Sequence, residues 1–181
     1  MASSSSSTRS HTRGGSTRST SAQDRVIKSL KDDHKRVKKA YREFQRLDEE
    51  GDTEACGAIV AQVLDELTVH AALEEELLYP AARSALEDES LIDEAEVEHE
   101  SMHIFIEQLR GMAPDADKFG ARFTVLCEYV LHHVKEEEGE IFPQLEKTDL
   151  DWDGLADAMT QRREELAPVP AEEDADAAQG A

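Results

Sequence analysis

Apolar side chains recur every three or four positions along most of this chain, which is the spacing of an amphipathic helix. In the first such stretch Ile27, Leu30 and Val37 fall on one stripe, which ends before Gly51. Three further stretches follow, over residues 52–80, 88–110 and 115–143. No segment shows the period of two that marks a strand. Four long helices with short connections predict an all-α fold, an antiparallel up-down four-helix bundle.

The two ends of the chain and a short last segment differ from this pattern. Residues 1–22 are rich in Ser and Arg, and residues 167–181 are acidic and contain no Lys or Arg. Such compositions cannot bury enough apolar surface to fold, so both ends are predicted to be disordered. Residues 148–166 are amphipathic in part and predict a short extra C-terminal helix. The folded bundle is therefore expected over residues 23–147.

Histidine occupies positions on the apolar stripes where Leu or Ile would be expected. Each predicted long helix carries one such residue, and the four are His34, His70, His99 and His133. A further polar residue lies four positions after three of them, on the same helix face, and these three are Glu74, His103 and Glu137. Burying unpaired carboxylates and imidazoles is unfavourable by several kcal/mol, so such a core needs compensating charge. Metal cations would supply that charge.

An internal repeat strengthens this interpretation. The segment HAALEEELLYP at residues 70–80 aligns without a gap on HVKEEEGEIFP at residues 133–143. Upstream of the two copies stand Asp33-His34 and Glu98-His99, at similar distances. The chain therefore consists of two helix pairs, each with a His on its first helix and a His-x-x-x-Glu on its second. Two matched ligand sets predict two metal ions side by side.

These motifs resemble those of the hemerythrin-like, HHE cation-binding family. The resemblance implies a non-haem di-iron centre, with two iron ions joined by an oxo or hydroxo bridge. The implied ligands are His99, His103 and His133 for one iron, His34 and His70 for the other, and Glu74 and Glu137 as bridges. The iron with fewer protein ligands would keep an open position for dioxygen, hydrogen peroxide or nitric oxide.

The last helix departs from the pattern of the oxygen-carrying members of that family. Those proteins have an acid five positions after the histidine, whereas the repeat selects Glu137, four positions after His133. Pairing His132 with Glu137 would restore the spacing of five. The different spacing weakens the inference that this protein carries oxygen reversibly. His132 remains an alternative ligand to His133.

Charge and composition narrow the range of partners. With 20 Lys+Arg against 41 Asp+Glu, the net charge is −21, so the chain repels phosphate backbones and anionic lipid. No nucleic-acid or membrane partner is expected. The N-terminal segment has no apolar stretch of the kind that a secretory signal needs, which predicts a cytoplasmic protein. Cys56 and Cys127 form no CxxC motif and are expected to be ordinary helix residues.

Three classes of function stay open at this point. The first is a protein that binds or senses a small diatomic ligand or peroxide, with a redox or signalling partner. The second is a catalase or peroxidase in oxidative-stress defence. The third is a structural bundle whose metal ties four helices together. The sequence favours a soluble di-iron protein that handles dioxygen, peroxide or nitric oxide, and leaves catalysis open.

Overall fold

The computed structural model describes residues 16–167, with side chains from residue 22 onward. Every regular element in this part of the chain is helical, which confirms the predicted all-α class. The elements are α1 (Ser16–Glu50), α2 (Thr53–Leu73), η1 (Glu74–Leu78), α3 (Tyr79–Ala85), α4 (Ser90–Arg110), α5 (Phe119–Glu136), η2 (Glu137–Ile141), α6 (Phe142–Leu145) and α7 (Trp152–Leu166). The symbol η marks a π-helical turn, in which an N–H bonds to the carbonyl five residues earlier.

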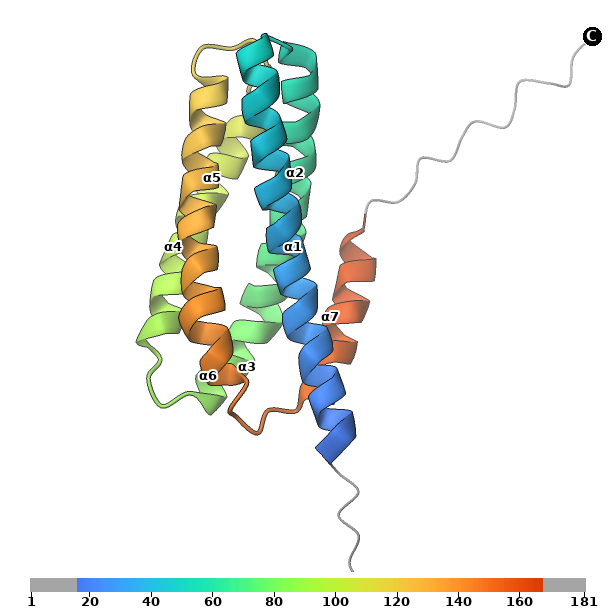
Figure 1. Ribbon diagram of the computed structural model, residues 1–181. Helices are drawn as coiled ribbons and strands as arrows, with labels where there is room; N and C mark the ends of the chain where they lie inside the picture. The colour runs from blue at the N-terminus through green and yellow to red at the C-terminus, as the bar shows by residue number, and fades with distance from the viewer. Residues whose placement is uncertain (1–15, 168–181) are drawn as a thin grey trace, which may run out of the picture.

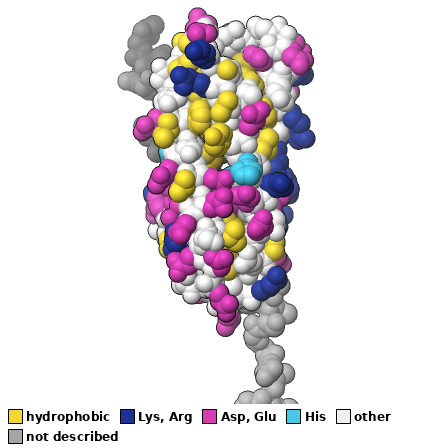
Figure 2. Space-filling model, turned by 90° about the vertical axis from the view of Figure 1, so that its left-hand side faces the viewer, with side chains coloured by type: hydrophobic (Ala, Val, Ile, Leu, Met, Phe, Trp, Pro, Cys, Tyr) yellow, Lys and Arg dark blue, Asp and Glu magenta, His cyan; other side chains and the backbone are white. Residues whose placement is uncertain are grey.

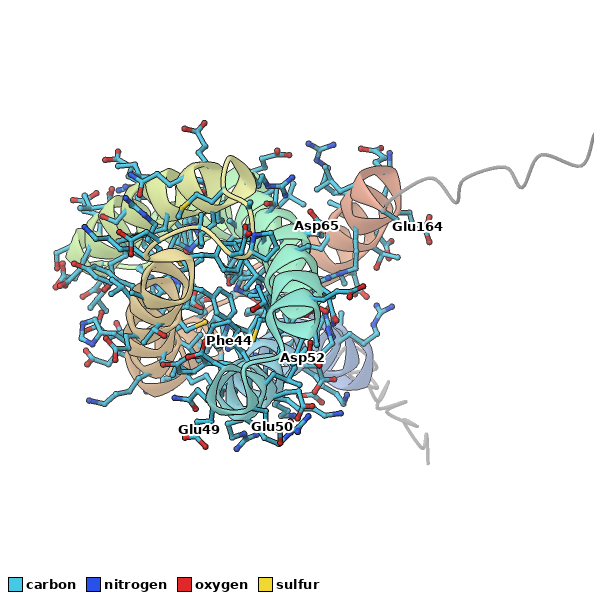
Figure 3. The ribbon with its side chains drawn as sticks, turned by 90° about the horizontal axis from the view of Figure 1, so that it is seen from above. Phe44, Glu49, Glu50, Asp52, Asp65 and Glu164 are labelled. Carbon is cyan, nitrogen blue, oxygen red and sulfur yellow. The ribbon has the colours of Figure 1, made fainter. Side chains whose placement is uncertain are left out.

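Four long helices stand side by side and enclose the core. Helix α1 packs on α2 and α5, and α4 packs on the same two helices from the opposite side (Figure 1). Seen from above, Phe44 points into the enclosed space, whereas Glu49 and Glu50 point outward (Figure 3). Helix α7 lies outside this ring, against α1 and α2. The ring places one face of each long helix toward a common centre.

The first helix begins earlier than the sequence indicates. Disorder is expected over residues 1–22, but α1 starts at Ser16. Ala22 is fully buried, and the Gln23 side-chain amide donates a hydrogen bond to the Glu146 carbonyl at 2.7 Å. These contacts extend the helix into a segment whose composition alone predicts no structure. The remaining predicted tail residues, 1–15 and 168–181, lie outside the described residues.

Asp side chains and one residue in a left-handed backbone conformation determine where three other helices begin. Asp52 accepts a hydrogen bond from the Ala55 N–H at 3.1 Å and caps α2, and Asp151 caps α7 in the same way. Lys118 takes a left-handed backbone conformation with φ of 68°. Because an α-helix cannot contain that conformation, α5 begins at Phe119, four residues later than predicted.

Two prolines that were expected to end helices do not end them. Pro80 and Pro143 are the second residues of α3 and α6, directly after the π turns η1 and η2. Proline in the first turn of a new α-helical segment loses no hydrogen bond, since that N–H has no partner in any case. The helical path therefore continues to Ala85 in the first half and to Leu145 in the second.

Apolar side chains form two separate clusters along the helix axes. The upper cluster, near the α1–α2 turn, contains Val63, Phe123 and Leu126. The lower cluster, near the α3–α4 connection, contains Leu30 and Trp152, the latter contributed by α7. A layer of buried polar residues lies between the two clusters.

One continuous segment is long and apolar enough to cross a membrane on length and composition alone. This segment, Thr53–Ala85, is a core element of the helix assembly, and its buried apolar residues belong to both clusters. It also carries buried His70 and Glu74 between those clusters. Its hydropathy is therefore accounted for by packing inside the protein.

Candidate metal centre

The buried polar layer brings together six of the seven predicted ligand residues. One His comes from each long helix, and one Glu from each π turn. The six residues, all buried, are His34, His70, Glu74, His99, His133 and Glu137. Each has an atom suited to metal binding turned toward the others, and these atoms form two overlapping groups.

The first group, here called the His34–His70 site, joins the two halves of the chain. The Nε2 atoms of His34 and His70 lie 3.3 Å apart. His34 Nε2 is 3.2 Å from Glu137 Oε2, and His70 Nε2 is 3.1 Å from Glu74 Oε2. The four ligand atoms lie within 4.8 Å of one another, which is close enough to hold one ion.

The second group, the His99–His133 site, repeats this arrangement. The Nε2 atoms of His99 and His133 are 3.1 Å apart. His99 Nε2 lies 3.5 Å from Glu74 Oε2, and His133 Nε2 lies 3.5 Å from Glu137 Oε2. Each glutamate oxygen therefore faces one histidine of each site. Glu74 and Glu137 could therefore serve both groups of histidines.

Outer carboxylates fix the protonation pattern of all four histidines. The Nδ1 atoms of His34, His70, His99 and His133 lie 2.7 to 3.2 Å from carboxylate oxygens of Glu138, Asp33, Glu75 and Glu98, respectively. A carboxylate only accepts hydrogen bonds, so each Nδ1–H donates outward. Each neutral imidazole then directs the Nε2 lone pair toward the centre. Outer carboxylates of this kind are the usual partners of metal-binding histidines.

Several of the inner atoms lack partners within the part of the chain that the structure describes. Neither carboxylate oxygen of Glu74 has a hydrogen-bond partner among the described residues, and the same holds for Oε2 of Glu137. Buried carboxylate oxygens without partners are strongly unfavourable. Inward nitrogen lone pairs, facing each other and these oxygens, add to the cost. Metal cations would satisfy these groups, so the residues fit a metal site.

Protons take the place of cations when no metal is bound. Burial disfavours the charged form of His70, but the charge of Glu74 and the hydrogen bond to Asp33 outweigh burial and raise the pKa of His70 to about 10. Burial likewise opposes the charged form of His133, yet Glu137 raises its pKa. The charge of His133 in turn lowers the pKa of Glu137 against the effect of burial.

We therefore expect the metal-free protein to lose stability as the pH rises from 6.5 toward 10. The folded state holds the His70 proton more tightly than the unfolded chain, whose pKa is 6.5. This stabilisation is complete below pH 6.5 and is lost as the pH passes through about 10. Metal-loaded protein uses the neutral imidazole and lacks this loss. Melting temperatures measured with and without chelator across this range test the expectation; parallel profiles would contradict it.

Tyr79 joins the site although the apolar periodicity gave no sign of it. Its hydroxyl donates a hydrogen bond to Glu137 Oε1 at 3.2 Å, and the oxygen lies 3.1 Å from His99 Nε2 and 3.5 Å from His133 Nε2. Burial raises the pKa of the phenol well above its usual value, and the nearby carboxylates add to that effect. The π turn η1 returns the chain to the same face five residues after Glu74, and this turn brings Tyr79 inward.

The matching position in the second half holds Phe142, which makes the two sites different. Phe142 stacks on His34 with ring centroids 6.0 Å apart and planes 4° from parallel. The His99–His133 site thus has a phenol beside it, whereas the His34–His70 site has a benzene ring. In the sequence, the only sign of this difference was that Tyr79 in the first repeat aligns with Phe142 in the second.

Two further histidines considered from the sequence lie outside the centre. His103 has a side chain 44% exposed, and its Nε2 is 2.8 Å from Glu75 Oε1 and not among the inner atoms. Its counterpart Lys38 makes the corresponding contact with Glu138, at 3.2 Å. The His132 side chain is 58% exposed. The histidine of the last helix that faces the centre is His133.

A small cavity lies beside both sites, on the side of the upper cluster. Its volume is about 10 Å³, which is room for about one water molecule. Its walls include His34, His70 and His133 together with the apolar side chains of Val37, Leu67, Met102, Val130 and Val134. The arrangement therefore offers two adjacent cation positions and a narrow, largely apolar space next to them.

Comparisons with known proteins agree with this geometry. A protein named DNA nickase from Nostoc sp. (strain PCC 7120 / SAG 25.82 / UTEX 2576) is 33% identical over 110 residues, which are 61% of this chain and 30% of that protein. The chain thus spans less than a third of the length of that relative. No solved structure matches the chain. The family model of the hemerythrin HHE cation-binding domain matches residues 25–145, which is most of the chain. The protein therefore belongs to the hemerythrin HHE cation-binding domain family.

Proposed function

We propose that the protein is a non-haem di-iron protein, an up-down four-helix bundle that binds and processes dioxygen, hydrogen peroxide or nitric oxide. The observation that carries this proposal is a pair of matched histidine sites sharing two buried carboxylates, beside a cavity of about 10 Å³. The repeat in the sequence and the family both favour two ions of the same kind.

The donor set supports iron. Imidazole with carboxylate suits several transition metals, but a closed zinc site uses four unshared ligands in a tetrahedron. Here two carboxylates face two histidine pairs, so a pair of ions held by these residues would share ligands, unlike a closed zinc site. When bound, an iron pair would supply the two electrons that reduction of hydrogen peroxide to water requires and accept the two that oxidation to dioxygen releases.

The surroundings support a very small ligand. The cavity has room for a molecule of about the size of water, and Val37, Leu67 and Met102 keep much of its wall apolar. Dioxygen, nitric oxide and hydrogen peroxide have two heavy atoms each, so they are the smallest substrates beyond water that a slight widening of this cavity would admit. The Tyr79 hydroxyl, held protonated by burial, is a proton donor at the His99–His133 site.

The name of the Nostoc relative points to a second class, cleavage of DNA, which the geometry of this chain disfavours. The six inner residues are at most 6% exposed, and the adjoining cavity is far too small for a nucleotide. A net charge of −21 repels the phosphate backbone. The shared region is also only 30% of that relative, so it does not identify the part that cuts DNA.

Oxygen evolution from peroxide tests the proposal. Iron-loaded protein is expected to release dioxygen over many turnovers in an oxygen electrode if it acts as a catalase, and to give a stoichiometric change in its visible spectrum if it only binds. Tyr79→Phe is expected to keep the iron but to slow turnover about 100-fold, the usual effect of losing a positioned proton donor. Phe142 in the matching turn indicates that a phenylalanine fits there.

Tyr129→Phe is the matched control, because Tyr129 is 48% exposed on α5 and is not one of the residues of the buried polar layer. Its activity and iron content should equal those of the unchanged protein. An iron-loaded preparation that neither turns over peroxide nor responds to dioxygen, peroxide or nitric oxide would leave only the structural role.

A further inference from the structure

A second group of metal-binding side chains lies on the surface beside the centre. Glu98 of α4 meets His132 and Glu136, which are one turn apart on α5. His132 Nε2 is 3.2 Å from Glu136 Oε1 and 3.6 Å from Glu98 Oε1. One imidazole nitrogen and two carboxylate oxygens lie within 4.8 Å of one another. We call these three residues the flank cluster.

The flank cluster is open to solvent and free of competing cations. The side chains of His132, Glu136 and Glu98 are 58%, 29% and 16% exposed. Among the described residues, neither glutamate makes an ion pair with Lys or Arg. Figure 2 shows the face that α4 and α5 turn outward, where acidic side chains lie on one side of a histidine at mid-height and basic side chains lie on the other. A divalent cation approaching this face meets ligands and a negative field.

One carboxylate connects the flank cluster to the buried centre. While Oε1 of Glu98 faces His132, its Oε2 accepts the hydrogen bond from His133 Nδ1 at 2.7 Å. His133 in turn presents Nε2 to the inner atoms. An ion held in the flank cluster is therefore separated from the centre by a single imidazole ring.

The opposite flank of the molecule has no such group. The residues that match the flank cluster in the first repeat are Asp33, Val69 and Leu73. Asp33 is paired with two guanidinium groups, those of Arg36 and of Arg163 on α7. Leu73 is fully buried and Val69 is partly buried in the lower cluster, next to α7.

The outer carboxylates of the two histidine sites also differ in their partners. The outer carboxylates of the His34–His70 site, Asp33 and Glu138, contact Arg or Lys. Those of the His99–His133 site contact only histidines. The two halves therefore match at the inner histidines and glutamates but differ in the residues around them. The more negative surroundings lie on the side of the flank cluster.

We propose that Glu98, His132 and Glu136 form an outer divalent-cation site that captures metal from solution and loads the buried centre. The proposal rests on the centre being a metal site. One imidazole and two carboxylates, with water completing the shell, suit Fe²⁺, Mn²⁺ or Co²⁺ and bind them less tightly than the inner groups. An ion held there is concentrated next to His133, which accelerates its entry.

Titration of metal-free protein with Co²⁺ tests the site, because bound Co²⁺ is measured by its visible spectrum and by equilibrium dialysis. The unchanged protein is expected to bind two ions tightly and a third more weakly. The double variant His132→Ala, Glu136→Gln is expected to lose the weak ion and keep the tight pair. At limiting Co²⁺ its centre should fill about tenfold more slowly, in the range of electrostatic effects on association. Neither replaced side chain contacts an inner ligand.

Glu100→Gln is the control, since Glu100 is an exposed carboxylate of α4 that belongs to none of the groups of metal-binding side chains found in the described residues. It should load at the unchanged rate. Equal loading rates and three bound ions in the double variant would overturn the outer site. A protein that never binds the tight pair would instead overturn the metal centre, and the weak ion alone would then report on the flank cluster. Circular dichroism of each variant verifies that the helices are intact.

Discussion

Glu74→Gln is expected to reduce metal binding at the buried centre by at least about 100-fold. The change keeps the shape of the side chain but removes the charge of an oxygen that lies 3.1 Å from His70 Nε2 and 3.5 Å from His99 Nε2. Replacing even an outer partner of a metal ligand typically weakens binding 10- to 100-fold, so a shared ligand should count for more. Iron content per chain, determined by elemental analysis after dialysis, measures the effect.

Glu74 has a second role in the metal-free state, where its charge stabilises the protonated form of His70. Glu74→Gln is therefore also expected to lower the stability of the metal-free protein, and circular dichroism of the variant verifies that the helices are intact. Glu140→Gln is the control, because Glu140 lies on the same π turn as Glu137 but is exposed. Two irons per chain in Glu74→Gln would show that Glu74 is not a shared ligand.

Removal of the metal is expected to lower the melting temperature by about 10 to 20 °C. Two ions, each present at about 100 times its dissociation constant, stabilise the folded state by about 5 kcal/mol in total. For a chain of this length about 1 kcal/mol corresponds to about 2 to 4 °C. Thermal unfolding followed by circular dichroism, before and after chelation and again after adding iron back, measures the difference.

The Glu74→Gln variant provides the internal comparison for this experiment. Its melting temperature should change much less on chelation, because its loaded state holds less metal. A melting temperature unaffected by chelation in the unchanged protein would mean that protons satisfy the layer as well as cations do.

The inward positions of the four histidines could be predicted because they follow α-helical spacing. His34, His70, His99 and His133 take core positions on four stripes, and the structure turns all four inward. His103 shares the stripe of His99, but Glu75 lies between its ring and the inner atoms. The counterpart of His103 in the repeat is Lys38, a residue that cannot be an inner ligand here. At this position the internal repeat predicts the placement of the side chain better than the apolar stripe does.

The features that escaped prediction depend on tertiary packing or on a different helical period. Tyr79 reaches the site because η1 is a π turn, and a period of 3.6 residues places it elsewhere. The helical start of α1 at Ser16 depends on contacts near Ala22 and Gln23 with distant segments. The outer carboxylates Asp33 and Glu98 occupy matching positions in the two repeats, so the sequence could have indicated their role as partners of His70 and His133. Their different neighbours come from tertiary packing and could not be predicted from the sequence.

The two π turns have a consequence for how sequence variation can accumulate in this protein. Each adds one residue to a helical turn just below the ligands, so the apolar stripe of the lower cluster is not a continuation of the stripe above it. Along α2 and α5, a substitution in one cluster therefore need not follow the register of the other, whereas α1 and α4 pass through both clusters without a change of period. The layer of histidines and glutamates is the level at which the two registers meet.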